Sequence, residues 1–457
     1  MTTEDTTQSV LFPELFLKPV LAEFDQPDSS SDGGAVLLKG VDSKLSLTER
    51  LAGCLNDPRQ PGKVVHETVD LLRQRIFGIA CGYPDCNDSD ALADDPIQKL
   101  LLDRDPITGQ SLGSQPTLSR FENAVSNKDL FRMGEELADI VVEHHAKRLG
   151  RKVRRITIDL DPTDDPTHGS QQLSFFNGHY GSFCYLPMVG TLQFDREREQ
   201  YLFAVVLRPG NAHCSRGAIG ILRRIIEKLR QAFPEARLRV RLDGGFATPA
   251  VFDYLELERV EYLVAMASNA VLERHSEPLM RAVRTLSAVS GETETIFADI
   301  SSYSAKTWPH PRRVIIKAEV VRFPGRLPKD NDRYVVTNLP HKPENVYTIY
   351  RQRGDMENRI KELHHGLEID RTSCTDFRAN QFRVLLTVAA YVLMQEIRNL
   401  ASGTEFASAQ VSTLRERLFK LGVWVERSVR RIVLHLPLGC PWFRAWRLIA
   451  QAVGATC

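Results

Sequence analysis

Acidic residues occupy several positions where a carboxylate can take part in chemistry. Asp159 and Asp161, in ITIDLD, lie near the end of a run that alternates like a β-strand, so both side chains point to the same face. Asp243, in RLDGGFA, ends another such run and precedes two glycines, which let a backbone or ligand approach closely. Asp is also a common turn former, and we accept that reading for Asp164 and Asp165. Acids at strand ends are typical of sites, and paired carboxylates can act as acid and base, as in glycosidases.

A further acid, Glu357, lies in IYRQRGDMENRIKELHHGLE, residues 349–368, which we expect to be helical. Steps of three and four residues place five polar side chains on one stripe: Tyr350, Arg353, Glu357, Lys361 and His364. Another stripe is apolar and is the expected buried face: Met356, Ile360, Leu363 and Leu367. Arg and Glu at helical spacing most often form a solvated ladder of ion pairs, and this stretch alone favours that reading.

Hydrophobic periodicity indicates the elements that must position these acids. Short helices are expected at 45–55, 63–80, 90–102, 116–125 and 128–148. From residue 151, three strands are followed by a helix near 216–233, the strand ending at Asp243, a helix near 249–258 and the strand EYLVAMA. The order is therefore βββαβαβ. Residues 285–338 again read as strands, and residues 377–400 as a buried helix.

Both ends of the chain differ from this centre. Residues 1–42 lack periodicity and contain DQPDSSSDGG, which predicts a flexible arm. Residues 411 onward predict a small helix, two short strands and a helix. In SQPTLSRFENA, Arg120 lies in the first turn of a predicted helix, where it suits contact with DNA, although the same residues are ordinary helix caps.

The composition excludes few functions, but it indicates a globular protein. The chain has 457 residues, 42% of them hydrophobic, so it can form a large core. Lys and Arg number 59 against 58 Asp and Glu, so net charge does not indicate a polyanionic partner. Eight scattered cysteines predict free thiols, and neither a secretory signal nor a membrane span is expected. We therefore expect a cytoplasmic globular protein with no membrane partner.

Taken together, these residues resemble the DDE-type transposases of bacterial insertion sequences. The resemblance rests on D-x-T at 161–163, on Asp243 in RLDGGFA, and on Tyr350, Arg353 and Glu357 at the spacing Y-x2-R-x3-E. The Lys that usually closes the signature, seven residues after the Glu, is replaced by His364. DDPTHGSQQLSFFNGHYGSFCYLP is similar to the thirteen-eighty family of these elements. The matches span about residues 100–435.

The resemblance implies an α/β fold with a ribonuclease H-like catalytic core. It divides the chain into a flexible arm (1–42), a helical DNA-binding domain (43–150), the first part of the core (151–270), a β-rich insertion (271–340), closing core helices (341–403) and a C-terminal α/β region (404–457). It makes Asp161, Asp243 and Glu357 the ligands of two Mg²⁺ or Mn²⁺ ions, with Asp159 in reserve.

The resemblance also assigns DNA contacts. Tyr350, Arg353, Lys361 and His364 would hold the DNA strand. Trp308 would stack near a flipped base, as in relatives that close hairpins, although a place in the core of the insertion is the simpler reading. His168 and Gln171 either approach the scissile phosphate or are polar groups satisfied within their loop.

The predicted function is a transposase that binds terminal inverted repeats and catalyses metal-dependent DNA cleavage and strand transfer by in-line phosphoryl transfer. Its partner is double-stranded DNA, at the element ends and at the target, and we expect a homodimer in the synaptic complex. One alternative is a glycosidase, which needs no metal, but the arginine-rich stripe beside Glu357 argues against it. The other is a non-catalytic, transposase-derived DNA-binding protein.

Overall fold

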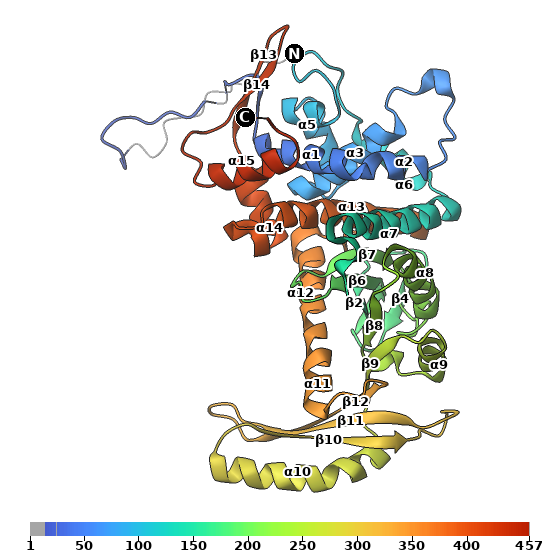
Figure 1. Ribbon diagram of the computed structural model, residues 1–457. Helices are drawn as coiled ribbons and strands as arrows, with labels where there is room; N and C mark the ends of the chain where they lie inside the picture. The colour runs from blue at the N-terminus through green and yellow to red at the C-terminus, as the bar shows by residue number, and fades with distance from the viewer. Residues whose placement is uncertain (1–13, 24, 457) are drawn as a thin grey trace. The chain divides into compact units, whose positions relative to one another are not determined.

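The structure is a computed structural model that describes residues 14–23 and 25–456 (Figure 1). It consists of two compact units. Unit 1 comprises residues 1–44, 61–119 and 396–457, and unit 2 comprises residues 45–60 and 120–395. Each unit is therefore assembled from separated stretches of the chain. All the acids of interest lie in unit 2.

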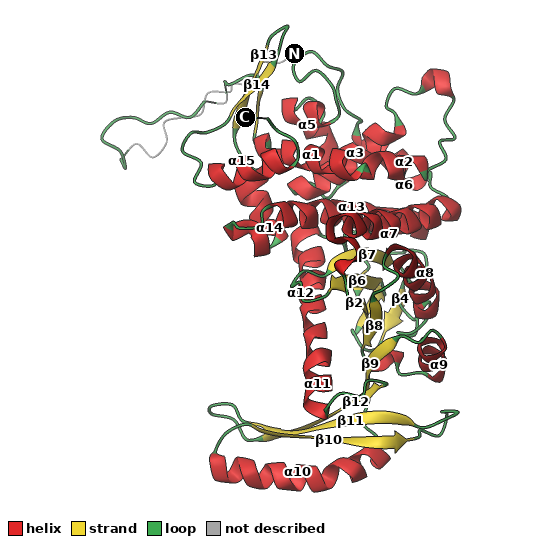
Figure 2. Cartoon of the chain, viewed as in Figure 1, coloured by secondary structure: helices red, strands yellow, loops and turns green. Residues whose placement is uncertain are grey.

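Unit 2 is built on an eight-stranded mixed sheet (Figure 2). In spatial order its strands are β10 (Glu294–Tyr303), β11 (Arg312–Val321), β12 (Lys329–Thr337), β9 (Glu261–Met266), β8 (Arg237–Leu242), β2 (Arg155–Pro162), β6 (Met188–Phe194) and β7 (Tyr201–Val206). Strand β2 is parallel to β8 and antiparallel to β6. Its residues 156–161 are all buried, as expected for a strand that is covered on both faces.

The predicted order βββαβαβ is confirmed. After β2, β6 and β7 come α8 (Ala218–Ala232), β8, α9 (Pro249–Leu257) and β9. Helix α8 buries a stripe of apolar side chains at helical spacing, which include Ile221, Leu222, Ile225 and Leu229. Helices α8 and α9 make the crossovers that the parallel pairs β2–β8 and β8–β9 require. A small sheet between β2 and β6, in the order β3 (Asp165–Pro166), β5 (Ser182–Tyr185) and β4 (Phe175–Asn177), was not predicted as a separate unit.

The strand-rich insertion extends the same sheet, because β12 pairs antiparallel with β9. Three strands were predicted here and three are found. Helix α10 (Ala270–Ser290) was missed, and Figure 1 shows it lying along one face of β10–β12. It contains Pro278, which removes a backbone donor and weakens the helical signal, yet Leu272, Met280 and Val283 give it a buried face.

Long helices complete unit 2. Helix α7 (Asn127–Leu149) begins with a capping box in which the Ser126 hydroxyl accepts from the Asp129 backbone amide. Helix α13 (Phe377–Leu400) has the predicted bounds, and its residues 384–394 are buried as expected. Helices α2 (Leu47–Gly53) and α6 (Gln115–Asn123) also match predicted segments. No helix of the described residues has both the length and the apolar character needed to cross a membrane.

The predicted single helix at 349–368 is interrupted. Helix α11 (Pro343–Arg351) is joined by a 3₁₀ turn, Gln352–Gly354, to α12 (Asp355–Lys361), and a π-helical turn, Glu362–Gly366, follows. The backbone therefore changes its pitch twice within the stripe from Tyr350 to His364. Such mid-helix changes are frequent at functional sites.

Unit 1 contains short helices and a small sheet. Its elements are α1 (Val36–Leu45), α3 (Thr68–Cys81), α4 (Ser89–Leu92), α5 (Pro96–Leu101), α14 (Val411–Leu414), α15 (Phe443–Ala452) and strands β1 (Ser29–Ser30), β13 (Val423–Arg427) and β14 (Ile432–His435). Strand β1 pairs with β13, and β13 with β14.

The prediction of a flexible arm over residues 1–42 was wrong for residues 29–42. Residues 1–13 and 24 lie outside the described part of the chain. Buried Asp32 accepts a hydrogen bond from Gln98 and pairs with Lys420 at 2.7 Å. A Cβ on Gly34 would lie 1.7 Å from the Leu418 carbonyl oxygen. The Ser, Asp and Gly content that predicted a linker instead permits close packing.

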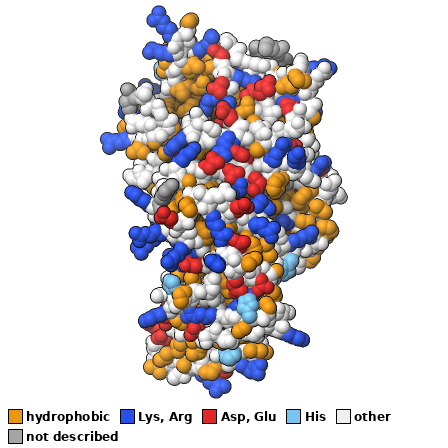
Figure 3. Space-filling view, turned by 45° about the vertical axis from the view of Figure 1, so that its right-hand side comes forward, with side chains coloured by type: hydrophobic (Ala, Val, Ile, Leu, Met, Phe, Trp, Pro, Cys, Tyr) orange, Lys and Arg blue, Asp and Glu red, His pale blue; other side chains and the backbone are white. Residues whose placement is uncertain are grey.

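Basic and acidic side chains are interspersed on the face shown in Figure 3, in keeping with the balanced composition. On this face, a broad basic surface therefore does not identify the functional site. The site has to be found from individual side chains.

Candidate functional site

The two acids of strand β2 have different surroundings, although they lie on the same face. Asp159 is fully buried, and both of its oxygens accept hydrogen bonds from Arg241, at 2.8 and 2.7 Å. Gln200 donates a third hydrogen bond at 2.9 Å. The Arg241 side chain is itself fully buried on the neighbouring strand β8. Asp159 is therefore neutralised inside the sheet, and Asp161 is the candidate left for chemistry.

Asp161 lies at the end of β2, and the charges of two other acids act on its carboxyl. Burial raises the pKa of its carboxyl to about 7; Arg353 opposes this shift, and the negative charges of Asp243 and Glu357 add to it. The three acids predicted from the sequence are therefore close enough to interact electrostatically.

Asp243 directly follows β8 and caps a 3₁₀ turn. Its Oδ1 accepts a hydrogen bond from the Gly245 backbone amide at 2.9 Å. A Cβ on Gly245 would lie 2.6 Å from the Cβ of Cys214, so glycine is needed for the loop that carries Cys214 to approach. The two glycines were expected to let a backbone or ligand approach closely, and here it is the loop of Cys214 that does so.

Glu357 is exposed in the first turn of α12, and side chains around it anchor that helix to unit 2. Met356 is fully buried. Arg359 pairs with Glu199 at 3.0 Å and with Glu362 at 3.1 Å. The buried Glu362 also accepts a hydrogen bond from Tyr391 at 2.6 Å.

Among the remaining residues of the predicted stripe, Arg353 and His364 each contact a residue outside the helix. Arg353 Nη2 lies 2.6 Å from Asp161 Oδ1. Burial raises the pKa of the Tyr350 phenol to about 12, and the charge of Arg353 opposes this shift. Lys361 is exposed. His364 Nε2 lies 3.0 Å from Thr163 Oγ1 and its Nδ1 lies 3.3 Å from Asp370, so it connects the end of the helix to the D-x-T segment.

Two polar residues after Asp161 have structural contacts. Gln171 donates hydrogen bonds to the carbonyls of Thr372 and Cys374, and its Oε1 accepts from the backbone amide of the exposed His168.

Asp165, which we interpreted as a turn former, is instead buried, and the Thr372 hydroxyl donates to it at 2.8 Å. Burial raises the pKa of the Asp165 carboxyl to about 7.

Trp308 and Arg120 are the two predicted DNA contacts outside the segment 349–368. Trp308 is 7% exposed and packs edge-on against Phe252 and Tyr303, with ring centroids 5.3 and 5.6 Å apart. Its ring has the surroundings of a core residue, which supports the simpler reading over base stacking. Arg120 is exposed on α6.

Tyr180 was missed by the sequence analysis. Burial raises the pKa of its phenol to about 12, and the charges of Asp164 and Asp161 add to the shift. The residue lies in the turn between β4 and β5, next to Gly181, whose φ is +67°. The signal that could have found it is an aromatic residue between two glycines in NGHYGSF, within the segment that follows the first acid.

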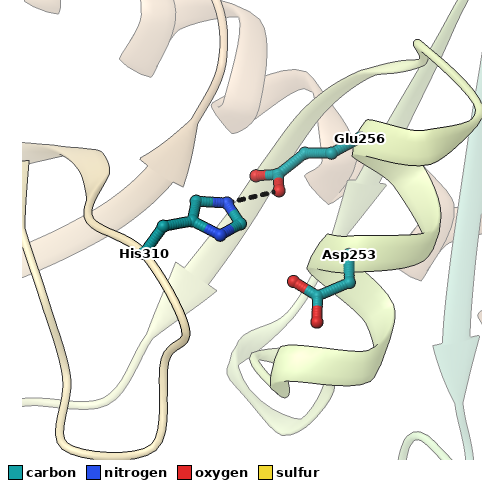
Figure 4. Close-up of side chains that lie close together, drawn as sticks. All are labelled: Asp253, Glu256 and His310. Atoms are coloured by element: carbon teal, nitrogen blue, oxygen red, sulfur yellow. Dashed lines mark hydrogen bonds and ion pairs between the residues drawn. The ribbon is translucent and has the colours of Figure 1, made fainter.

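A second acidic group could by its ligand types hold a metal ion. Atoms of Asp253, Glu256 and His310 lie within 4.8 Å of one another, and His310 faces Glu256 (Figure 4). Arg312, whose side chain is 1% exposed, pairs with Asp253 at 2.5 Å and with Glu256 at 2.8 Å. Because a buried guanidinium already neutralises these carboxylates, we interpret the group as an ion-pair cluster that joins α9 to β11.

A comparison with known protein families gives a match over nearly the whole chain. The family model described as Transposase DDE domain group 1 matches residues 12–455. No curated protein matches this chain.

Proposed function

From the finding that the chain belongs to the family of transposases with a DDE domain, we propose that it binds the terminal inverted repeats of an insertion sequence and catalyses metal-dependent DNA cleavage and strand transfer. The proposed catalytic residues are Asp161, Asp243 and Glu357. The segment DDPTHGSQQLSFFNGHYGSFCYLP is the reason to propose the thirteen-eighty group within that family.

The observation that carries this proposal is that the charges of Asp243 and Glu357 act on the carboxyl of Asp161. Asp161 comes from β2, Asp243 from the end of β8 and Glu357 from α12. Burial raises the pKa of Asp161, and the charges of the other two acids add to this shift. The spatial order β7-β6-β2-β8-β9, in which the first strand lies beside the fourth, supports a ribonuclease H-like core. In such a core, carboxylates from distant segments meet at one edge of the sheet.

The donor set fits hard divalent cations. All three groups are carboxylates. Burial raises the pKa of Asp161, the negative charges of Asp243 and Glu357 add to this shift, and a bound cation would offset both effects. Asp161, Asp243 and Glu357 would hold two Mg²⁺ or Mn²⁺ ions. When bound, such ions activate the attacking oxygen and stabilise the leaving oxygen in phosphoryl transfer.

Other side chains of this chain orient the DNA. Arg353 and exposed Lys361 supply positive charge for phosphates beside the acids, and Tyr350 supplies a phenol that burial keeps protonated. His364 acts through Thr163, since its contact there holds the end of the helix against the segment that carries Asp161. The partner is double-stranded DNA, bound by a homodimer in the bacterial cytoplasm.

The test is a nicking and strand-joining assay with Mg²⁺ or Mn²⁺ on duplexes that carry the DNA flanking the reading frame. Glu357→Gln keeps the size of the side chain but removes one charge, so we expect activity to fall by roughly a thousand-fold or more. Binding in a gel shift should persist, because it depends on positive charge. Asp355→Asn is the matched control, since it removes an exposed charge from the same helix turn.

Near wild-type nicking by Glu357→Gln would remove Glu357 from the active site. Binding without nicking by the wild-type protein would instead identify a non-catalytic, transposase-derived DNA-binding protein. Activity that persists after chelation would contradict the metal-dependent mechanism.

A further inference from the structure

Arg353 contacts an acid of the proposed metal site directly. Its Nη2 lies 2.6 Å from Asp161 Oδ1, and each side chain is only 12% exposed. The residue lies in the 3₁₀ turn Gln352–Gly354, between α11 and α12, and not on a regular helical stripe. Burial lowers the pKa of its guanidinium, but Asp161, Tyr350 and Asp243 together outweigh this effect, so the pKa is raised above its usual value. Arg353 and Asp161 therefore form a largely buried ion pair.

Arg353 is also incompletely satisfied. Its Nε is buried and, among the described residues, has no hydrogen-bond partner. An unpaired buried donor is costly, and a phosphate oxygen is a strong acceptor that could satisfy it. The charge of Asp243 acts on Arg353 as well as on Asp161. The guanidinium thus supplies the positive charge that a metal ion would otherwise supply to Asp161 and Asp243. One of its donors, Nε, still lacks an acceptor.

We infer that Arg353 is the resident counter-ion of the acid cluster when DNA is absent, and that it competes with a divalent cation for Asp161. A DNA phosphate that draws the guanidinium away would expose Asp161 to the cation. Metal and DNA would then bind with positive coupling, and each would tighten the other by the same factor. This inference rests on the proposed function and adds to it that Arg353 weakens metal binding at Asp161 until DNA is bound.

The test measures metal binding and not activity. Mn²⁺ is titrated by calorimetry, or by the spin resonance of the free ion, into the full-length protein without DNA. Arg353→Ala and Arg353→Gln should bind Mn²⁺ roughly ten- to a hundred-fold more tightly than wild type, a range typical of coupled sites. Arg351→Ala is the matched control, because it removes an exposed arginine two residues away and should leave the affinity unchanged. Arg353→Gln retains volume and hydrogen bonding, so it keeps the test open if Arg353→Ala does not fold.

A second arm adds a DNA duplex before the Mn²⁺ titration. The duplex should tighten Mn²⁺ binding to the wild-type protein, and the gain should shrink in both Arg353 variants. Asp161→Asn shows whether the measured Mn²⁺ is at the acid cluster, because it should weaken binding in every background.

The outcomes separate this inference from the proposed function. Equal Mn²⁺ affinity in wild type and both Arg353 variants, with binding lost in Asp161→Asn, would overturn the role of Arg353 but leave the metal site intact. Mn²⁺ binding that Asp161→Asn does not change would contradict both. Tighter binding in the two Arg353 variants but not in Arg351→Ala would establish the competition.

Discussion

Replacing Asp161 by Asn is expected to stabilise the metal-free protein at alkaline pH. The carboxyl has a pKa of about 7 in the folded chain against an ordinary value of 3.8, because burial and two neighbouring acids disfavour its charged form. A raised folded-state pKa contributes stability that is fully present below about pH 3.8 and is lost as the pH rises through 7. Above pH 7, the ionised group therefore opposes folding.

The magnitude follows from the shift. About three pH units at roughly 1.4 kcal/mol each amount to about 4 kcal/mol. The side chain is 12% exposed, so solvent screening reduces this little. The pKa already includes the attraction of Arg353, so no separate loss of that ion pair is added. Asn resembles the protonated acid, so Asp161→Asn should stabilise the protein by up to about 4 kcal/mol at pH 8 and by almost nothing near pH 4.

Asp159→Asn is the matched comparison, because it makes the same change two residues earlier on the same strand face. Asp159 and Arg241 are both fully buried and paired through two hydrogen bonds. Breaking a buried pair leaves an uncompensated charge and costs about 3–5 kcal/mol. The two substitutions should therefore have opposite signs at pH 8.

The assay is urea unfolding of each variant in the presence of a chelator at pH 8 and pH 5. Added Mn²⁺ should stabilise wild type but not Asp161→Asn, because a ligand that binds the folded state raises its stability. If Asp161→Asn were less stable than wild type at pH 8, or if its effect did not change with pH, the reasoning from burial and crowded charge would fail.

Two further predictions concern DNA binding and packing. Lys361→Ala should lower the slope of log affinity against log salt by about one unit, with Lys329→Ala, an exposed lysine on β12, as the control; an unchanged slope in Lys361→Ala would remove its phosphate contact. Trp308→Ala should cost about 3–5 kcal/mol in urea unfolding, because the buried ring packs on Phe252 and Tyr303, whereas a ring used for base stacking would lose DNA binding with little change in stability.

The central strands and the strand-terminal acids could be predicted because their signals are local. Alternation over a few residues identifies β2 and β8, and Asp243 before Gly-Gly ends a strand. The choice between Asp159 and Asp161 could not be made locally, since both lie on one face. It depends on Arg241, a residue 82 positions along the chain that pairs with Asp159.

The failures have physical causes of the same kind. Residues 29–42 were mistaken for an arm because small polar residues indicate a linker when their packing partners, more than 300 residues away, are unknown. Helix α10 was missed because Pro278 interrupts its pattern, and its apolar face is recognisable only once the sheet it packs on is known. The two glycines beside Tyr180 indicate a turn, but the sequence alone does not show that the charges of Asp164 and Asp161 act on its phenol.

The contacts of the arginines around Glu357 show whether the polar stripe is a solvated ladder of ion pairs. A solvated ladder requires partners on the same helix, yet Arg353 pairs with Asp161 on the central strand, and Arg359 reaches Glu199 before β7. His364 likewise contacts Thr163, two residues after Asp161. These contacts join α12 to the sheet at several points and leave Glu357 exposed among them. The polar stripe is therefore not a surface ladder of ion pairs, and the effect of the Glu357 charge on Asp161 supports the proposed role of Glu357 as a metal ligand.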